Sequence, residues 1–158
     1  MAYDNKGNNK GYGNKPYNNK NEESPKLPIG YLEGGYYTKK NDELVLKKEY
    51  IVEFPKEIAE ALSLDRNKNK RSQIRKFYEY TLRIQDLLRR KNGDFSIVEA
   101  ELNRLIPYVT YANSRATVTQ LFEDFIRKNV KNIQSEKDLV AFVKHFEAIV
   151  AYLPKEKN

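Results

Sequence analysis

The chain has 158 residues, of which 29 are Lys or Arg and 22 are Asp or Glu, so its formal net charge at pH 7 is +7. The absence of cysteine excludes disulfides and thiolate metal sites, and no apolar run approaches the roughly 20 residues that cross a bilayer. The N-terminus lacks the apolar core of a signal peptide. We expect a soluble, cytoplasmic protein with one domain and a tail, whose positive charge favours polyanionic partners.

The first part of the chain has low complexity. Residues 1–26 are rich in Asn, Lys, Gly and Tyr and carry few, widely spaced apolar side chains. Burial therefore cannot offset the entropy of ordering them, and we expect a disordered arm. Its tyrosines alternate with lysines. The tyrosines could stack on bases, and the lysines could contact phosphates. A solubilising tail has a similar composition.

A second segment, residues 27–54, begins with a Pro- and Gly-containing loop. Two β-prone runs follow, Leu44–Leu46 and Tyr50–Val52, separated by charged residues. They fit either short strands or an extended segment packed on helices, so the segment is predicted to be irregular or to contain short strands.

The remaining residues, 55–158, are predicted to be helical almost throughout, because apolar side chains recur at helical spacing. One-sided helices joined by short connections pack as a bundle. The expected fold is therefore all-α, a helical bundle of about five helices. The signals at the helix ends are Pro55 in a first turn, Asn92–Gly93 after a helix over about 70–91, Pro107 bending or interrupting a helix that starts near 95, and Ser135 capping the last helix.

Residues suited to catalysis are scarce. The single histidine, His145, lies at the edge of the last apolar helix face and is interpreted as a packed or half-exposed helix residue. One histidine and no cysteine cannot form a conventional His-rich metal site. The Gly-rich phosphate-binding motifs GxxxxGK(S/T) and GxGxxG do not occur either. We therefore predict no catalytic residues, no metal, no cofactor and no enzymatic activity.

The strongest functional signal is a basic cluster at a predicted helix start. Six Lys or Arg and no acid occur between Arg66 and Lys76. A helix start presents free backbone N–H groups and the positive end of the helix dipole. Arg71 and Arg75 repel each other mildly at i, i+4 spacing. The cluster therefore predicts contacts to a phosphate backbone, which carry no sequence information. The alternative is a basic surface without a specific partner.

Later in the same helix, the acid-first pairs Glu79–Arg83 and Asp86–Arg90 indicate a solvated, self-neutralising face. A second candidate segment runs over 108–115. Its two tyrosines are interpreted as core residues, although they could also contact RNA, and Arg115 is the better functional candidate.

Three blocks occur in the order found in a known family: Ser72–Tyr78 (SQIRKFY), Leu105–Tyr108 continuing to Arg115, and Phe142–Tyr152, which includes FEAIVAY. Over about residues 55–153 the chain resembles the small helical subunit of type III-A CRISPR effector (Csm) complexes. It departs from that family in its longer N-terminal part and in His145, which replaces an expected aromatic or apolar residue.

The resemblance implies a non-catalytic, RNA-binding subunit. Several copies would stack, contact other Csm subunits and line the channel that holds crRNA and target RNA in antiviral defence. Two alternatives stay open: a helical bundle that docks an acidic protein partner, and a stand-alone RNA chaperone that uses the arm. The cluster and the resemblance together give the candidate RNA-binding residues Lys68, Lys70, Arg71, Ser72, Gln73, Arg75, Lys76 and Arg115.

Overall fold

Amphipathic helices dominate the computed structural model, which describes residues 23–156. The expected arm therefore lies almost wholly outside the described residues. Within them, no helix is long and apolar enough to cross a membrane. The helices of this part are α1 (Glu53–Leu62), α2 (Arg71–Arg90), α3 (Phe95–Asn103), α4 (Leu105–Ser114), α5 (Gln120–Asn132) and α6 (Glu136–Tyr152).

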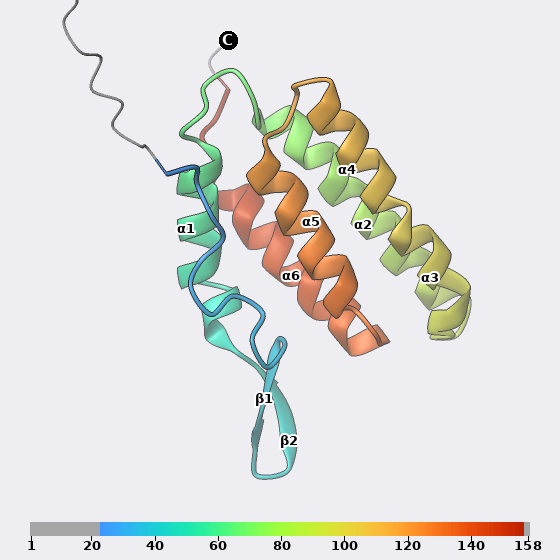
Figure 1. Cartoon of the computed structure of the whole chain (residues 1–158). Coiled ribbons are helices and arrows are strands. Elements are labelled where there is room, and N and C mark those ends of the chain that lie inside the picture. The colour runs from blue at the N-terminus through green and yellow to red at the C-terminus, as the bar shows by residue number, and fades with distance from the viewer. Residues whose placement is uncertain (1–22, 157–158) are drawn as a thin grey trace, which may run out of the picture.

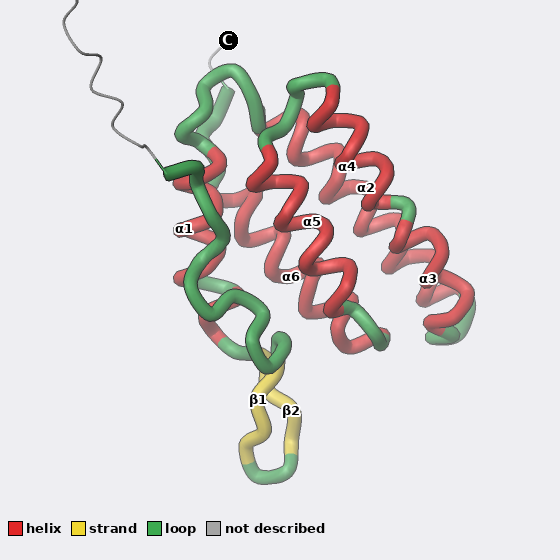
Figure 2. The backbone as a smooth tube through the Cα atoms, viewed as in Figure 1, coloured by secondary structure: helices red, strands yellow, loops and turns green. Residues whose placement is uncertain are grey.

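The helices form the predicted all-α bundle. Helices α1 and α2 both pack on α6, α5 packs on α4, and α3 contacts both α2 and α4. Figure 1 shows α5 and α6 in the middle, with α1 on one side and α2, α3 and α4 on the other. Figure 2 shows that short loops join most neighbouring helices. The hydrophobic core lies between these helices.

Local signals in the sequence explain where α2 ends and α6 begins. Asn92 and Gly93 adopt φ of 55° and 73°, a left-handed conformation that glycine tolerates without strain. The Gly93 N–H donates to the Leu88 carbonyl, closing α2. Ser135 accepts a hydrogen bond from the Asp138 N–H and caps α6. Both predicted boundaries are confirmed.

The break between α3 and α4 occurs at Arg104, not at Pro107. Pro107 occupies the third position of α4, within its first turn, where a backbone N–H has no partner inside the helix. Pro107 is therefore compatible with the start of α4. The predicted place of the interruption is wrong, because the break comes before Pro107, at Arg104.

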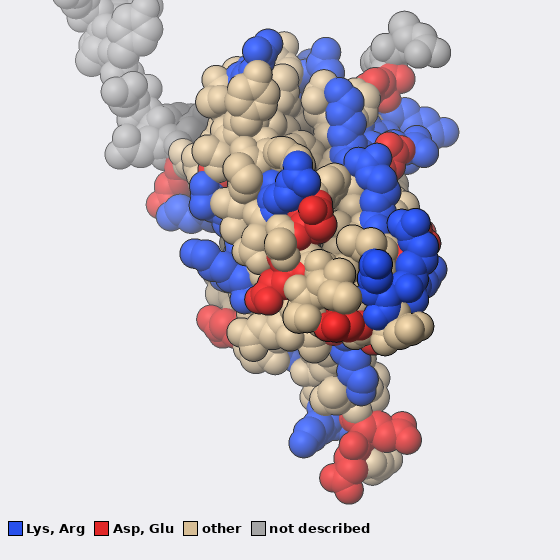
Figure 3. All heavy atoms as spheres, turned by 90° about the vertical axis from the view of Figure 1, so that its right-hand side faces the viewer, with Lys and Arg blue, Asp and Glu red and all other residues tan. Residues whose placement is uncertain are grey.

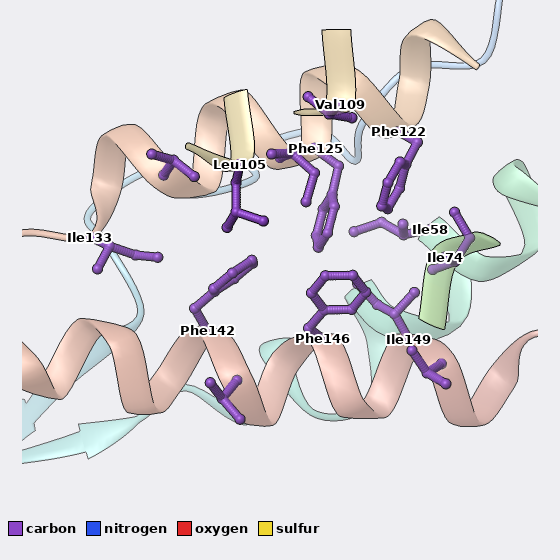
Figure 4. Packing of buried hydrophobic residues seen from close by; sticks show 14 of the residues in the cluster. Ile58, Ile74, Leu105, Val109, Phe122, Phe125, Ile133, Phe142, Phe146 and Ile149 are labelled. Carbon is purple, nitrogen blue, oxygen red and sulfur yellow. The ribbon is translucent and has the colours of Figure 1, made fainter. Parts of the chain in front are cut away.

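Aromatic side chains fill the centre of the bundle (Figure 4). Phe122 and Phe125 of α5 are fully buried against Phe142 and Phe146 of α6. The Phe125 and Phe146 rings meet edge to face, with centroids 5.3 Å apart, an arrangement that adds to the gain from burial. This packing fixes α5 on α6. Helices α2 and α4 lie on the side of this pair opposite to α1 (Figure 1).

A β-hairpin precedes the helices. Residues 27–54 therefore contain short strands, which is one of the two predicted alternatives. Strands β1 (Tyr37–Lys40) and β2 (Glu43–Leu46) are antiparallel. The two turn residues, Asn41 and Asp42, both have positive φ, as a two-residue hairpin turn of type I′ requires. The second β-prone run is not a strand: Lys48–Tyr50 forms a 3-10 turn (η1) that leads into α1.

Three buried tyrosines hold this N-terminal segment on the bundle. Tyr31, Tyr36 and Tyr50 are each 1% exposed, and they meet two buried polar residues of the helices, Asn129 and His145. We call these five residues the clasp. The clasp connects residues far apart in the sequence, so the segment before α1 is part of the folded domain.

The hydrogen bonds of the clasp form a continuous chain. Tyr36 Oη donates to Asn129 Oδ1 (2.7 Å), and Asn129 Nδ2 donates to Tyr31 Oη (2.9 Å). Tyr31 then donates to His145 Nε2 (2.6 Å), whose Nδ1–H donates to the Tyr50 carbonyl (2.6 Å). Burial lowers the pKa of His145 to about 4, so the ring is neutral at pH 7. His145 is thus packed, as predicted, and it joins the N-terminal segment to α6.

Candidate nucleic-acid interface

The two candidate RNA-binding segments lie side by side because a buried asparagine joins their loops. Asn69, 6% exposed, donates from its side chain to Thr119 Oγ1 (2.8 Å) and accepts from the Thr119 N–H (2.8 Å). Its own N–H donates to the Thr117 carbonyl (3.0 Å). Asn69 has φ of 56°, which asparagine tolerates better than most residues. The start of α2 is therefore held beside the end of α4.

A groove of about 540 Å³ lies between α2 and α4. Its floor is mostly apolar and its polar groups are mainly cations, tyrosine hydroxyls and one amide. Among residues 23–156, three of the lining residues are Lys or Arg and none is acidic. The lining consists of Gln73, Lys76, Phe77, Tyr80 and Arg83 from α2, Leu105, Tyr108, Tyr111 and Ala112 from α4, and Arg115 and Thr117 from the following loop.

Each of the three tyrosines in the groove has an arginine over its ring. The tyrosines of α4 are exposed, 41% for Tyr108 and 62% for Tyr111, so the interpretation of these two as core residues is wrong. Cation–π contacts of this kind hold both side chains in place. The pairs and their distances from guanidinium carbon to ring centroid are Arg83–Tyr80 at 5.5 Å, Arg104–Tyr108 at 5.4 Å and Arg115–Tyr111 at 5.7 Å.

Tyr80 lies at the centre of this arrangement. Its hydroxyl donates to Glu101 Oε2 (3.0 Å), and its ring meets the Tyr108 ring edge to face at 5.5 Å. Partial burial and the bond to Glu101 raise the pKa of Tyr80 to about 12, so it stays neutral at pH 7. Arg104 pairs with the same carboxylate at 3.2 Å. The Glu101 charge is thus compensated beside the groove.

A nearly buried carboxylate fixes α4 against α5. Glu123 is 6% exposed and accepts hydrogen bonds from Thr110 (2.8 Å), Asn113 (2.6 Å) and Arg127 (3.0 Å). Burial opposes its ionisation, but these bonds outweigh burial and lower the pKa of Glu123. The helix that carries Tyr108 and Tyr111 is therefore held in one position by a charged network behind it.

The structure divides the candidate residues into groups. Gln73, Lys76 and Arg115 line the groove. Arg71, Ser72 and Arg75 instead border a shallow depression shared with Lys155 and Glu156 of the C-terminal segment. Lys68 and Lys70 lie in the loop before α2, where Lys70 is the N-cap residue and Lys68 donates its N–H to Asp65.

The sequence suggested that the start of α2 has no acid beside it, but the structure places one there. Glu156 accepts a hydrogen bond from the Ser72 N–H (2.8 Å). Hydrogen bonding by Ser72 lowers the pKa of Glu156, with nearby Lys70 and Arg71 adding to the effect. A carboxylate distant in the sequence therefore occupies the position that the anion-site hypothesis assigned to phosphate.

Ion pairing on α2 also differs from the expectation in one place. Asp86–Arg90 forms at 3.4 Å, as predicted, but Glu79 pairs with Arg75 at 3.2 Å instead of with Arg83. The predicted Glu79–Arg83 pair is therefore wrong, because Arg83 lies over Tyr80 in the groove. Helical spacing places both arginines four residues from Glu79, so spacing alone could not choose between them.

One surface that was not predicted from the sequence combines Tyr80, Arg83, Arg104 and Tyr108. A signal was present, because each arginine lies three or four residues from its tyrosine and so shares its helix face.

Figure 3, which views the side of the bundle with α2, α3 and α4, shows Lys and Arg gathered along one side of this face. Acidic side chains lie mainly near its centre and at the end of the hairpin.

The groove thus combines fixed aromatic rings, three cations and an apolar floor. Aromatic rings and guanidinium planes stack on unpaired bases, and Lys and Arg contact phosphates. Among residues 23–156, no three His, Asp or Glu side chains are placed to hold a metal ion. These groups are of the kind that could contact a polyanion with planar groups.

Comparison with known proteins agrees with the family resemblance. The model of the family described as Csm2 Type III-A matches residues 46–156, from the end of the hairpin to the C-terminal segment. No curated protein and no solved structure matches the chain. Because the family match covers well over half of the chain, this protein belongs to the Csm2 Type III-A family and is a Csm2-like small subunit of type III-A CRISPR complexes.

Proposed function

We propose that the chain is a non-catalytic RNA-binding subunit whose copies stack along the crRNA–target RNA channel of a cytoplasmic type III-A complex. Family membership implies association with other Csm subunits, and the family is a structural one that is not known to be catalytic. In antiviral defence, each copy would contribute a few sequence-independent phosphate contacts. Individually weak contacts add up when copies are linked on a shared scaffold.

The groove between α2 and α4 carries this proposal. It presents Lys76, Arg83 and Arg115, and no acid of the described part of the chain lines it. Such a set of cations is suited to a phosphate backbone. Gln73 adds an amide that can bond to phosphate or sugar.

The remaining candidates are proposed to have a secondary role. Lys68, Lys70, Arg71 and Arg75 extend the positive charge beyond one end of the groove and would attract RNA at longer range. Ser72 would contribute directly only if its N–H exchanged Glu156 for phosphate.

Salt dependence of RNA binding tests the proposal. With three phosphate contacts, log K for single-stranded RNA should fall against log salt with a slope of roughly −2. In the double variant Lys76→Ala, Arg115→Ala the slope should approach about −1, because two contacts are removed. The matched control is Arg89→Ala, Arg90→Ala, which removes the same charge from the other end of α2. Equal slopes in all three proteins would refute the groove as the RNA site.

A pull-down of the tagged chain with and without RNase separates the proposal from its alternatives. We expect short guide RNAs together with several Csm subunits. A single acidic protein that is recovered despite RNase would instead identify a protein-docking surface. Heterogeneous RNA without Csm subunits, lost on deletion of residues 1–26, would indicate the chaperone.

A further inference from the structure

We propose that the groove between α2 and α4 takes an unstacked nucleobase of single-stranded RNA, and not only the phosphate backbone. This inference rests on the proposed RNA-binding function and adds the chemical class of the bound group. A surface that contacts only phosphates needs cations and hydrogen-bond donors. The groove offers more than that, because its area is mostly apolar and aromatic.

The rings are arranged to receive a flat group. Tyr80 and Tyr108 meet edge to face at 5.5 Å. Tyr111, on the next turn of α4, is 62% exposed and is held by Arg115 through both a ring contact at 5.7 Å and a hydrogen bond of 3.1 Å to its hydroxyl. A tyrosine left so exposed on a helix gains little from burial, and it forms a stacking surface at the edge of the groove.

The cations of the groove lie where the phosphates of such a nucleotide would be. Lys76 and Arg83 line it from α2, and Arg115 lines it from the opposite side. A base inserted between the two helices would therefore have its flanking phosphates near positive charge on both sides. Arginines that already contact a tyrosine ring, at 5.5 Å for Arg83 and 5.7 Å for Arg115, can also stack on bases, so the pairs need not separate fully.

The size of the groove is consistent with one base and its sugar and not with a duplex. A volume of about 540 Å³ is within the range of ordinary small-molecule sites. Paired bases are stacked inside their helix and present only edges and backbone. The groove should therefore prefer single-stranded RNA over a duplex of the same sequence.

Direct titration with matched oligonucleotides tests the proposal. The full chain would be titrated at low salt with a short oligoadenylate, with an abasic oligonucleotide of the same length and with the corresponding RNA duplex. The abasic strand should bind roughly tenfold more weakly than oligoadenylate, because base–aromatic stacking of this size is lost while the phosphates remain. Equal affinity for the two strands would overturn the proposal.

Variants at Tyr111 separate stacking from charge. Tyr111→Leu keeps an apolar side chain but removes the ring, so it should weaken oligoadenylate binding roughly tenfold and leave abasic binding unchanged. Tyr111→Phe keeps the ring and is the matched control. If Lys76→Ala weakens both strands but Tyr111→Leu weakens neither, the base site is refuted and the proposed RNA function stands. If no groove variant changes the affinity for any strand, the proposed function itself fails.

Discussion

Two regions of this small domain each contain three tyrosines, and they use them in opposite ways. In the clasp, Tyr31, Tyr36 and Tyr50 are buried and bonded to neutral groups. In the groove, the tyrosines of α2 and α4 lie under arginines, and the two of α4 are exposed.

The partners of the hydroxyl groups explain this difference. A buried hydroxyl costs free energy unless it has a hydrogen-bond partner, and in the part of the chain that the structure describes every buried side-chain N or O has one. An exposed tyrosine needs no such partner in the protein, because water can bond to its hydroxyl. The clasp should therefore control stability, and the groove should control binding.

Replacing His145 with Leu should give the largest effect on stability. The substitution leaves the Tyr31 hydroxyl proton without its acceptor and the Tyr50 carbonyl without the donor from His145. At about 1–3 kcal/mol for each unsatisfied group, we expect the free energy of unfolding to fall by about 4 kcal/mol in urea titrations. The control is Lys144→Leu, a neighbouring exposed position. A loss below about 1 kcal/mol would show that the clasp rearranges without cost.

The pH dependence of stability should also depend on His145. Its pKa is lowered from 6.5 to about 4 in the folded protein, so between these values the unfolded chain binds the extra proton. Stability then falls as the pH drops through this window, by about 1.4 kcal/mol per pH unit and about 3 kcal/mol in total. The clasp tyrosines have raised pKa values and stay neutral in this range.

The measurement is the free energy of unfolding of wild type minus that of His145→Gln, followed from about pH 7 to about pH 4. The carboxylates titrate alike in both proteins and cancel in this difference. The difference should decrease towards acid. A constant value would contradict the lowered pKa of the buried ring.

Removing one tyrosine oxygen from each region compares them directly. Tyr36→Phe leaves Asn129 Oδ1 without its donor, so we expect a loss of about 1–2 kcal/mol in the free energy of unfolding. Tyr111→Phe removes an exposed hydroxyl whose hydrogen-bond partner within residues 23–156 is Arg115, so the free energy of unfolding should change by less than about 0.5 kcal/mol. Similar losses in both variants would remove the distinction between the clasp and the groove.

Most of the helical core was predictable because its signals are local. The apolar spacing of α6, the Ser135 cap and the Asn92–Gly93 stop all act within a few residues. The hairpin turn at Asn41 and Asp42 was also encoded locally and was overlooked. The clasp could not be predicted, because His145 and Tyr31 are 114 residues apart and only the folded chain brings them together.

The candidate site was predicted in part for the same reason. Charge alone indicates Lys76 and Arg115 as candidates. They line one groove because Asn69 joins the loop before α2 to the loop after α4. The interpretation of Tyr108 and Tyr111 as core residues was wrong because their spacing on the helix does not reveal which face a neighbouring helix covers. Glu156 shows the same limit, since it reaches the start of α2 from the other end of the chain.

The smallest expected effect separates two residues that are adjacent in the sequence. Lys76 lines the groove, whereas Arg75 pairs with Glu79 at 3.2 Å and borders the depression beside the C-terminal segment. Lys76→Ala should weaken RNA binding about fivefold at 0.1 M salt, the value of one released counterion. Arg75→Ala should weaken it less than about twofold, because Arg75 lines the depression beside the C-terminal segment and not the groove. The two variants compared by fluorescence anisotropy on one RNA decide this. An equal or larger loss for Arg75→Ala would move the RNA path out of the groove and along the N-terminal end of α2.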